Sequence, residues 1–168
     1  MNPDDLHKNY RPNIGITLFN RDGAVFYGRR MMRGGTIEDR VGAHRWQMPQ
    51  GGIDKGEAPI TAAYRELKEE TGVASAQLLT ITPGWLTYDF PENYKRKNWR
   101  GQRQKWAAML FTGEASEINL SADDHQEFDD WRWGDLEEAP SLIVPFKRNV
   151  YEELMAAFLP LRDYIRSL

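Results

Sequence analysis

Residues 51–73 read GGIDKGEAPITAAYRELKEETGV, a glycine-rich turn followed by a stretch with helical spacing. Three glutamates of that stretch, Glu66, Glu69 and Glu70, stand at positions i, i+3 and i+4 and therefore share one arc of the expected helix. Like charges at this spacing repel by roughly 0.2–0.5 kcal/mol per pair on an exposed helix. A bound cation would offset the repulsion, and ligands that are all oxygen favour Mg²⁺ or Mn²⁺ over zinc.

A solvated acidic face is the alternative explanation for the three glutamates. Arg65 and Lys68 lie nearby in the sequence. They are roughly 100–200° around the helix from the carboxylate arc, so we expect neither of them to neutralise it. Spacing alone leaves metal binding and a solvated face both open.

The same stretch contains a longer pattern of nine fixed positions. Gly51 comes first, Glu57 follows after five residues, and the helical part then reads Arg65-Glu66-Leu67-x-Glu69-Glu70-x-Gly72-Val73. This pattern resembles the signature of the Nudix hydrolases, with every defining position filled. The resemblance implies metal-dependent hydrolysis of a nucleoside diphosphate linked to a further group. It also implies roles for particular residues: metal binding by Glu66, Glu69, Glu70 and the Gly51 carbonyl, and a bracing ion pair between Glu57 and Arg65.

The chemistry of a phosphoanhydride agrees with such a carboxylate cluster. The anhydride is kinetically inert largely because its oxygens repel a nucleophile, and divalent metal ions neutralise that charge and lower the pKa of bound water. One further acid is needed, either to accept the proton of the water or to complete a second metal site. A glutamate of the signature and an acid from a distant loop are both possible sources, and the sequence does not choose between them.

The composition predicts one compact domain that spans residues 1–168, with a core over about 10–158. Its 168 residues are 40% hydrophobic, which is enough for a proper core. The absence of cysteine excludes disulfides and thiolate metal sites. No apolar run approaches the roughly 20 residues of a membrane span, and residues 1–13 lack the apolar centre of a signal peptide. We therefore expect a cytoplasmic protein with no membrane partner, and the sequence does not identify any protein partner.

Charge is distributed unevenly along the chain. The net charge is −3, yet residues 91–106 carry six Lys or Arg against one Glu. A basic segment in an acidic protein indicates local contact with an anion. Tyr94 and Trp99 stand among these cations, a combination typical of contact with single-stranded nucleic acid. A solvated basic loop is the alternative.

Hydrophobic periodicity predicts strands and two main helices. The expected strands are residues 13–19, 24–28, 77–82, 84–89, 105–112 and 130–134, and a loop is expected over 29–45. One helix is expected over 57–71, with Ile60, Ala63, Tyr64 and Leu67 on its apolar side, and Gly72 as its end. A second amphipathic helix is expected over 146–158, with Pro160 interrupting it. A mixed sheet between helices is an α/β fold, specifically an α/β/α sandwich, which is also the Nudix fold.

Further segments resemble one subgroup of the family. They read Tyr10-Arg11-Pro12-Asn13, Trp46-Gln-x-Pro-Gln-Gly-Gly, Gly101-Gln-x-Gln-Lys-Trp106, Glu127-Phe-Asp-x-Trp-Arg-Trp133 and Phe146-Lys147-Arg148. Over residues 10–158 the chain looks like the bacterial RNA 5′-pyrophosphohydrolases and the similar diadenosine polyphosphate hydrolases. It departs from compact members of the group in a longer loop over residues 31–45.

The subgroup resemblance implies additional site residues. Glu127 would be the further acid, as a fourth metal ligand or as the general base. Arg11 and Arg30 would contact substrate phosphates, where a guanidinium binds oxygens bidentately. Phe146 would stack on a base with Lys147 close by, and Tyr88 would reach a phosphate. The three histidines have no metal-ligand spacing and receive no role.

Three hypotheses of function follow from these motifs. The first is conversion of 5′-triphosphorylated RNA ends to 5′-monophosphate with release of pyrophosphate or phosphate. The second is hydrolysis of a dinucleoside polyphosphate such as diadenosine tetraphosphate by the same metal-dependent chemistry. The third is a catalytically silent nucleotide- or RNA-binding module, against which the intact set of carboxylates argues.

Overall fold

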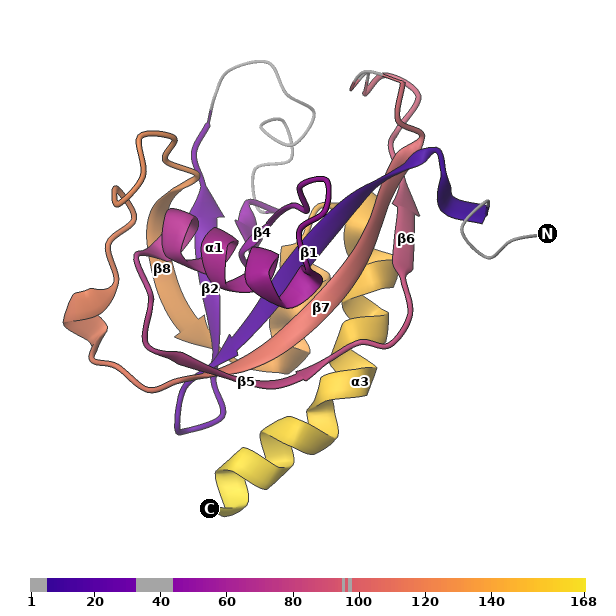
Figure 1. Cartoon of the computed structure of the whole chain (residues 1–168). Coiled ribbons are helices and arrows are strands. Elements are labelled where there is room, and N and C mark those ends of the chain that lie inside the picture. The colour runs from indigo at the N-terminus through magenta and orange to yellow at the C-terminus, as the bar shows by residue number, and fades with distance from the viewer. Residues whose placement is uncertain (1–5, 33–43, 95, 97) are drawn as a thin grey trace.

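A mixed sheet forms the centre of the molecule (Figure 1). The computed structural model describes residues 6–32, 44–94, 96 and 98–168. The sheet's main path runs in the order β3-β2-β1-β7-β5, with β4 paired to β1, β6 to β7 and β8 to β2. The strands are β1 (Tyr10–Phe19), β2 (Val25–Arg30), β3 (Trp46–Gln47), β4 (Gln50–Gly52), β5 (Ala76–Ile81), β6 (Leu86–Asp89), β7 (Gly101–Phe111) and β8 (Phe128–Gly134).

The central pair, β1 and β7, is the parallel pair that makes the sheet mixed. It runs in register from Tyr10 beside Gly101 to Phe19 beside Leu110, whereas the other recorded pairs are antiparallel. From Asn13 to Phe19 every residue of β1 is buried, as expected for a strand that is covered on both faces. The β1–β7 pair therefore lies between two hydrophobic layers.

Helix α1 (Pro59–Thr71) covers one face of the sheet, in front of it in Figure 1. Its Ala62, Ala63 and Leu67 pack against alternate residues of β1, including Ile14 and Ile16. The helix starts two residues later than predicted, at Pro59, because the fixed φ of proline suits a first helical position. It ends as predicted at Gly72, which adopts a left-handed φ of 75° and donates its N–H to the Lys68 carbonyl.

The predicted apolar side of α1 was partly wrong. Ile60 and Tyr64 are 42% and 37% exposed, while Glu66 and Glu70 are buried. The helix is rotated so that part of its acidic arc, and not its full apolar side, faces inward. A helix that only packed on a sheet would not bury two carboxylates.

Helix α3 (Arg148–Ser167) covers the opposite face of the sheet. Its Tyr151 packs edge-on against Trp106 of β7, with ring centroids 5.4 Å apart. The prediction that Pro160 interrupts this helix was wrong, because the helix runs through Pro160 to Ser167. Pro160 and Ala156, whose carbonyl lacks the helical donor, are both exposed, so water can bind that carbonyl, and Phe158 and Ile165 remain packed on both sides of Pro160.

Short helical turns connect β8 to α3. They are η4 (Leu136–Glu138), α2 (Ala139–Leu142) and η5 (Pro145–Lys147), and a further turn, η3 (Ala115–Glu117), follows β7. Phe146, predicted as the first residue of the last helix, lies in η5. With helices on both sides of a mixed sheet, the predicted α/β/α sandwich is confirmed.

The strand predictions located the sheet but not its ends. The structure adds β3 and β4, which were not predicted as strands, and it begins β7 at Gly101, four residues earlier than predicted. The added segments read Trp46-Gln47, Gln50-Gly51-Gly52 and Gly101-Gln102-Arg103-Gln104. Polar strand residues there gave no alternating hydrophobic signal.

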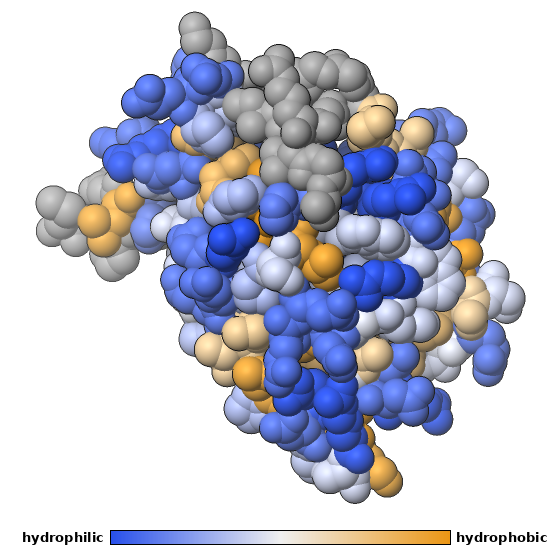
Figure 2. All heavy atoms as spheres, turned by 180° about the vertical axis from the view of Figure 1, so that it is seen from behind, coloured by the Kyte–Doolittle hydropathy of each residue, from blue (hydrophilic) through white to orange (hydrophobic). Residues whose placement is uncertain are grey.

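From behind, the described surface is mainly hydrophilic, with its hydrophobic residues scattered in small groups (Figure 2). Within the described part of the chain, no helix has both the length and the apolar character needed to cross a bilayer.

Candidate active site

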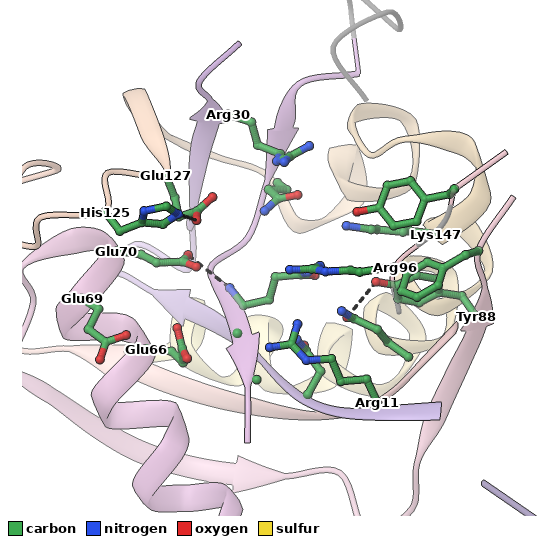
Figure 3. Close-up of a pocket in the computed structure, with 18 of the residues that line it drawn as sticks. Arg11, Arg30, Glu66, Glu69, Glu70, Tyr88, Arg96, His125, Glu127 and Lys147 are labelled. Carbon is green, nitrogen blue, oxygen red and sulfur yellow. Dashed lines mark hydrogen bonds and ion pairs between the residues drawn. The ribbon is translucent and has the colours of Figure 1, made fainter. Parts of the chain in front are cut away.

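One pocket gathers most of the predicted site residues. It has a volume of about 590 Å³, and segments from the whole length of the chain line it. Its acidic lining residues are Glu66, Glu69, Glu70, Asp123 and Glu127, and its basic ones are Arg11, Arg30, Arg96, His125 and Lys147. Figure 3 shows the labelled glutamates on one side of this space, and Arg11, Arg96 and Lys147 on the other. We call these two sides the acidic wall and the basic wall.

The acidic wall comes from α1 and from the residue that precedes β8. Glu66, Glu69 and Glu70 project from the helix, and Glu127 lies beside Glu70 on the same side of the pocket (Figure 3). The N–H of Met31 donates to the Glu127 carbonyl over 2.9 Å, which ties the acid to the end of β2. The structure therefore brings together the three glutamates of the signature and the distant acid that the sequence predicted.

The predicted ion pair between Glu57 and Arg65 is present and bidentate. Arg65 Nε and Nη2 each donate to a Glu57 carboxylate oxygen over 2.8 Å, and Nη2 also donates to the Gly52 carbonyl over 2.9 Å. These bonds hold the glycine turn against α1. Because Arg65 donates to it, the pKa of Glu57 falls to about 2.

Arg65 also contacts the carboxylate arc, contrary to our expectation from helical geometry. Its Nη1 lies 2.7 Å from Glu66 Oε1 and 3.3 Å from Glu69 Oε2. A guanidinium on a long side chain reaches around the helix surface farther than the angular position of its Cα indicates. Arg65 therefore supplies part of the positive charge that the arc needs.

Burial disfavours the charged forms of Glu66 and Glu70. The pKa of Glu70 is raised well above its ordinary range, first by burial and then by the charges of Glu127 and Glu66. Burial also raises the pKa of Glu66, although Arg65 acts in the opposite direction. The Gln50 N–H donates to Glu70 Oε2 over 3.3 Å, a weak compensation for a buried charge. Carboxylates in this condition gain the most from a nearby cation.

The donor set of the acidic wall fits a hard divalent metal. All its side-chain donors are carboxylate oxygens, and the Glu66 carboxylate lies so close to Gly51 that an added Cβ would stand 1.9 Å from Glu66 Cδ. Glycine is thus required at the position whose carbonyl was predicted to touch metal. Among the described residues, no three acidic or histidine side chains are gathered closely enough to ligate one ion as they stand. Arg65 holds Glu66 and Glu69 instead.

The basic wall contains two guanidiniums that face the same space. Arg11 comes from β1 and Arg96 from the segment between β6 and β7 (Figure 3). The pKa of Arg11 is lowered by burial and then by the charge of Arg96. A polyanion between the two guanidiniums would offset both the desolvation of Arg11 and its repulsion from Arg96. Arg96 was not among the predicted site residues, although it belongs to the basic segment that the charge count singled out.

Lys147 and Arg30 complete the positive side of the pocket. Lys147 is only 5% exposed, and its ammonium lies 5.6 Å from the centroid of the Tyr88 ring. Arg30 ends β2, in the register opposite Phe128, which places it beside Glu127. All three cations predicted to lie near the substrate, Arg11, Arg30 and Lys147, therefore line the pocket.

A network of side-chain amides adjoins the pocket, and two of its members, Asn13 and Gln50, line it. Gln104 Nε2 donates to Asn13 Oδ1 over 2.8 Å and to Gln50 Oε1 over 3.1 Å, and its Oε1 accepts from Trp106 Nε1 over 3.2 Å. These residues come from β1, β4 and β7 and fix the relative positions of the three strands. Sequence analysis noted the glutamines of residues 101–106 as a motif without assigning them this role.

Aromatic side chains border the basic wall. Tyr88, Phe90 and Tyr94 line the pocket, whereas Phe146 packs against Tyr88 and Tyr94 at centroid distances of 5.8 and 6.1 Å. The Tyr88 hydroxyl donates to Gln102 Oε1 over 2.8 Å (Figure 3). A phosphate contact by Tyr88, as predicted, would compete with this bond. Phe146 belongs to the aromatic group but is not among the residues that line the pocket.

His125 is another pocket residue that was not predicted. Its Nε2 lies 3.8 Å from Glu127 Oε1. A lone histidine in a polar loop gives no spacing signal, and its proximity to the acids follows from the loop before β8. The extended loop predicted over residues 31–45 lies largely outside the described residues, which omit 33–43.

Comparison with known proteins agrees with the geometry of the pocket. A family model described as the NUDIX domain matches residues 9–154. A protein of Caulobacter vibrioides named RNA pyrophosphohydrolase is 54% identical over 157 residues, which cover 90% of this chain and 87% of that protein. A Rhodospirillum rubrum protein with the same name is 50% identical over 151 residues, covering 88% and 86% of the two chains.

Solved structures show the same fold at much lower identity. The Escherichia coli dihydroneopterin triphosphate pyrophosphohydrolase superimposes with a TM-score of 0.63 at 18% identity, covering 88% of this chain and 98% of that one. A Caenorhabditis elegans Ap4A hydrolase complex gives a TM-score of 0.58 at 18% identity, with the same coverage. At this identity the comparison concerns the arrangement of helices and strands alone.

Proposed function

We propose that this chain, which belongs to the Nudix hydrolase family, converts the 5′-triphosphate end of RNA to a 5′-monophosphate. The observation that carries the proposal is the pocket with an acidic wall opposite a basic wall. The relatives at 54% and 50% identity, both named RNA pyrophosphohydrolase, support the choice of RNA as the substrate. The products are the 5′-monophosphorylated RNA and pyrophosphate, or phosphate released in successive steps.

The acidic wall holds the divalent metal, Mg²⁺ or Mn²⁺, in this proposal. Its ligands would come from Glu66, Glu69, Glu70 and Glu127, with the Gly51 carbonyl. Bound there, the metal supplies neutralisation of phosphate charge and a lowered pKa for its water. Arg65 would stay paired with Glu57 and so keep α1 and the glycine turn together, and Glu66 and Glu69 would no longer contact its Nη1 when they hold the metal.

The carboxylates also accept the proton that leaves the attacking water. Glu70 is buried, Glu127 lies beside it, and each has an oxygen on the pocket side (Figure 3). A buried carboxylate with a raised pKa accepts a proton more readily than an exposed one. We assign proton acceptance to one member of this pair, and the other would join Glu66 and Glu69 among the metal ligands.

The basic wall binds and orients the triphosphate. Arg11 and Arg96 would bind phosphate oxygens from one side and Arg30 from the mouth, with planar donors suited to two oxygens at once. Lys147 adds a buried positive charge beside the aromatic group of Tyr88, Phe90, Tyr94 and Phe146. A base of the first nucleotide would stack on this group, and stacking is worth roughly 1–3 kcal/mol per base. We place this reaction in the cytoplasm.

A direct assay tests the proposed function. The wild type with Mg²⁺ is incubated with 5′-triphosphorylated RNA and, separately, with diadenosine tetraphosphate, and kcat/KM is compared for the two substrates. We expect faster conversion of the RNA. Glu70→Gln keeps the shape of the side chain and should reduce kcat/KM by about 100-fold or more.

Each alternative has its own outcome in this assay. Faster cleavage of diadenosine tetraphosphate would make the protein a dinucleoside polyphosphate hydrolase. No cleavage of either substrate, with retained binding of triphosphorylated RNA, would support the silent binding module. Arg96→Ala, which leaves the acidic wall unchanged, should raise KM for the RNA about tenfold while kcat changes little.

A further inference from the structure

We propose that a second, smaller concavity binds a downstream nucleotide of the RNA whose 5′ end occupies the pocket. It has a volume of about 330 Å³ and is lined by Lys8, Asn9, Asn98 and Trp99. This size lies at the lower end of the range of small-molecule sites, roughly 300–1,000 Å³. The inference rests on the proposed function, because an RNA chain supplies the nucleotides beyond the first.

One loop connects the two sites. In the segment that joins β6 to β7, Tyr94 and Arg96 line the pocket, whereas Asn98 and Trp99 line the second concavity. The Trp99 N–H lies 3.3 Å from the Arg96 carbonyl to which it donates, so the backbone turns between them. Three residues span at most about 11 Å even when extended. A single strand leaving the pocket past Arg96 therefore reaches Trp99 within its neighbouring nucleotides.

The lining residues have the chemistry of a site for a nucleotide. Trp99 is half-buried, so it offers a ring face to a base while its position is held by the protein. The side-chain amides of Asn9 and Asn98 each carry a donor and an acceptor, which suits the edges of an unpaired base. Lys8 is exposed and supplies a positive charge for the backbone phosphate. A solvated loop would explain the lysine and the asparagines, but not a tryptophan in the wall of a concavity.

The loop that carries Trp99 is tied down at its base. The Tyr10 hydroxyl donates to Asp89 Oδ1 over 2.5 Å, and Arg100 Nη2 lies 3.0 Å from Asp89 Oδ2. The Arg100 N–H also donates to the Asn9 carbonyl over 2.9 Å, which joins the loop to the segment before β1. Both sides of the concavity are therefore fixed to each other, and less ordering is needed when a nucleotide binds.

The test compares RNA with a ligand too short to reach the concavity. Trp99→Ala is assayed on a triphosphorylated RNA of ten nucleotides, and the inhibition constant of a nucleoside triphosphate as competitor is measured in the same variant. We expect kcat/KM for the RNA to fall about tenfold, mainly through KM, and the inhibition constant to stay unchanged. Trp99→Phe keeps an aromatic face and should retain most of the wild-type value. Trp85→Ala, a tryptophan outside both sites, is the matched control.

The outcomes separate this inference from the proposed function. A wild type that cleaves no RNA overturns the proposed function itself. A wild type that cleaves RNA, combined with a Trp99→Ala variant of unchanged kcat/KM, overturns the second site alone. An equal loss for RNA and nucleoside triphosphate would also overturn it, because it would place the effect in the first pocket. If Trp99→Ala does not fold, the double variant Lys8→Ala/Asn98→Ala is expected to show the same loss on RNA alone.

Discussion

Individual side chains in the pocket are held in states that cost folding free energy. Glu66 and Glu70 are buried carboxylates that lie near each other and near Glu127, and burial raises the pKa of both. On the opposite wall, Arg11 and Arg96 repel each other, and Arg11 is partly desolvated. Groups in such conditions commonly belong to functional sites, where a ligand offsets the cost. Stability and activity therefore depend on these residues in opposite directions.

Glu70→Gln should stabilise the metal-free protein at neutral pH. The pKa of Glu70 is higher in the folded protein than in the unfolded chain, so the unfolded chain ionises first as the pH rises above 4.5. The folded protein therefore loses stability between pH 4.5 and the raised pKa. Glutamine removes that loss and keeps an oxygen for the Gln50 N–H. We expect the free energy of unfolding at pH 7 in EDTA to rise by at least about 1 kcal/mol. Urea unfolding measures it, with the exposed Glu153→Gln as control, and a decrease would contradict the prediction.

Glu57→Gln should destabilise the protein in a way that disappears in acid. The pKa of Glu57 is lowered to about 2, so its ion pair with Arg65 is fully present above about pH 4.5 and is lost as the pH falls toward 2. The variant should be less stable than the wild type at pH 7, and the two should converge below pH 4.5. Urea unfolding at a series of pH values is the measurement. Glu92→Gln, in an exposed position, is the control, and its free energy of unfolding should vary with pH as that of the wild type does.

Among the helices, α3 shows how tertiary packing overrides a local signal. Pro160 lacks the N–H for a helical hydrogen bond, yet the helix continues for seven residues to Ser167. Contacts near its end help to hold it there. Arg162 Nη1 lies 2.9 Å from Glu137 Oε1, Arg166 Nη2 lies 2.7 Å from Asp135 Oδ1, and Ile165 is buried. These contacts join the last turns of the helix to the segment around η4.

Pro160→Ala should therefore stabilise the folded protein. Alanine restores the missing hydrogen bond at an exposed position, and the gain exceeds the extra freedom of the unfolded chain, which is worth about 0.4–1 kcal/mol. We expect the free energy of unfolding to rise by about 1–2 kcal/mol in urea titrations. Pro140→Ala is the matched control, because Pro140 stands in the first turn of α2, where proline is favourable. An equal gain in both variants would refute this account of α3.

The whole molecule brings the two walls of the pocket together from distant parts of the chain. Arg11 comes from β1, the glutamates from α1, Arg96 from the β6–β7 segment, Glu127 from the approach to β8 and Lys147 from η5. The parallel register of β1 with β7 sets Arg11 beside Gln102, and the antiparallel pairing of β2 with β8 sets Arg30 beside Phe128. A ligand that bridges the walls thus connects both faces of the sandwich.

Divalent metal should stabilise the folded wild type much more than a variant that lacks one of the proposed metal ligands. At about 100 times its Kd, a ligand that binds only the folded state adds about 2.7 kcal/mol, or roughly 5–10 °C in Tm for a chain of this size. We expect this rise with Mg²⁺ over EDTA in the wild type, and a much smaller one in Glu69→Gln. Differential scanning calorimetry measures both, with the exposed Glu152→Gln as control. An equal rise in Glu69→Gln would remove Glu69 from the proposed ligand set.

Local sequence patterns were sufficient to predict most of the residues of the acidic wall. The spacing of Glu66, Glu69 and Glu70, and the glycine at the end of their helix, are properties of consecutive residues, so the sequence predicted their shared arc. The angular argument failed at Arg65, because side-chain length and not backbone position determines which carboxylates a guanidinium reaches. It failed again at Ile60, because the helix turns its acids toward the pocket.

The amino-acid sequence by itself determined the family, the α/β/α sandwich and the carboxylate arc, since these depend on periodicity and on a spacing within 23 residues. Only the tertiary structure decided that Arg96 and His125 line the pocket, that Gln104 joins three strands, and that a second concavity forms around Trp99. These features depend on strand register and loop packing between residues far apart in the chain. No local period carries that information, because pairing and packing between distant segments of the chain fix it.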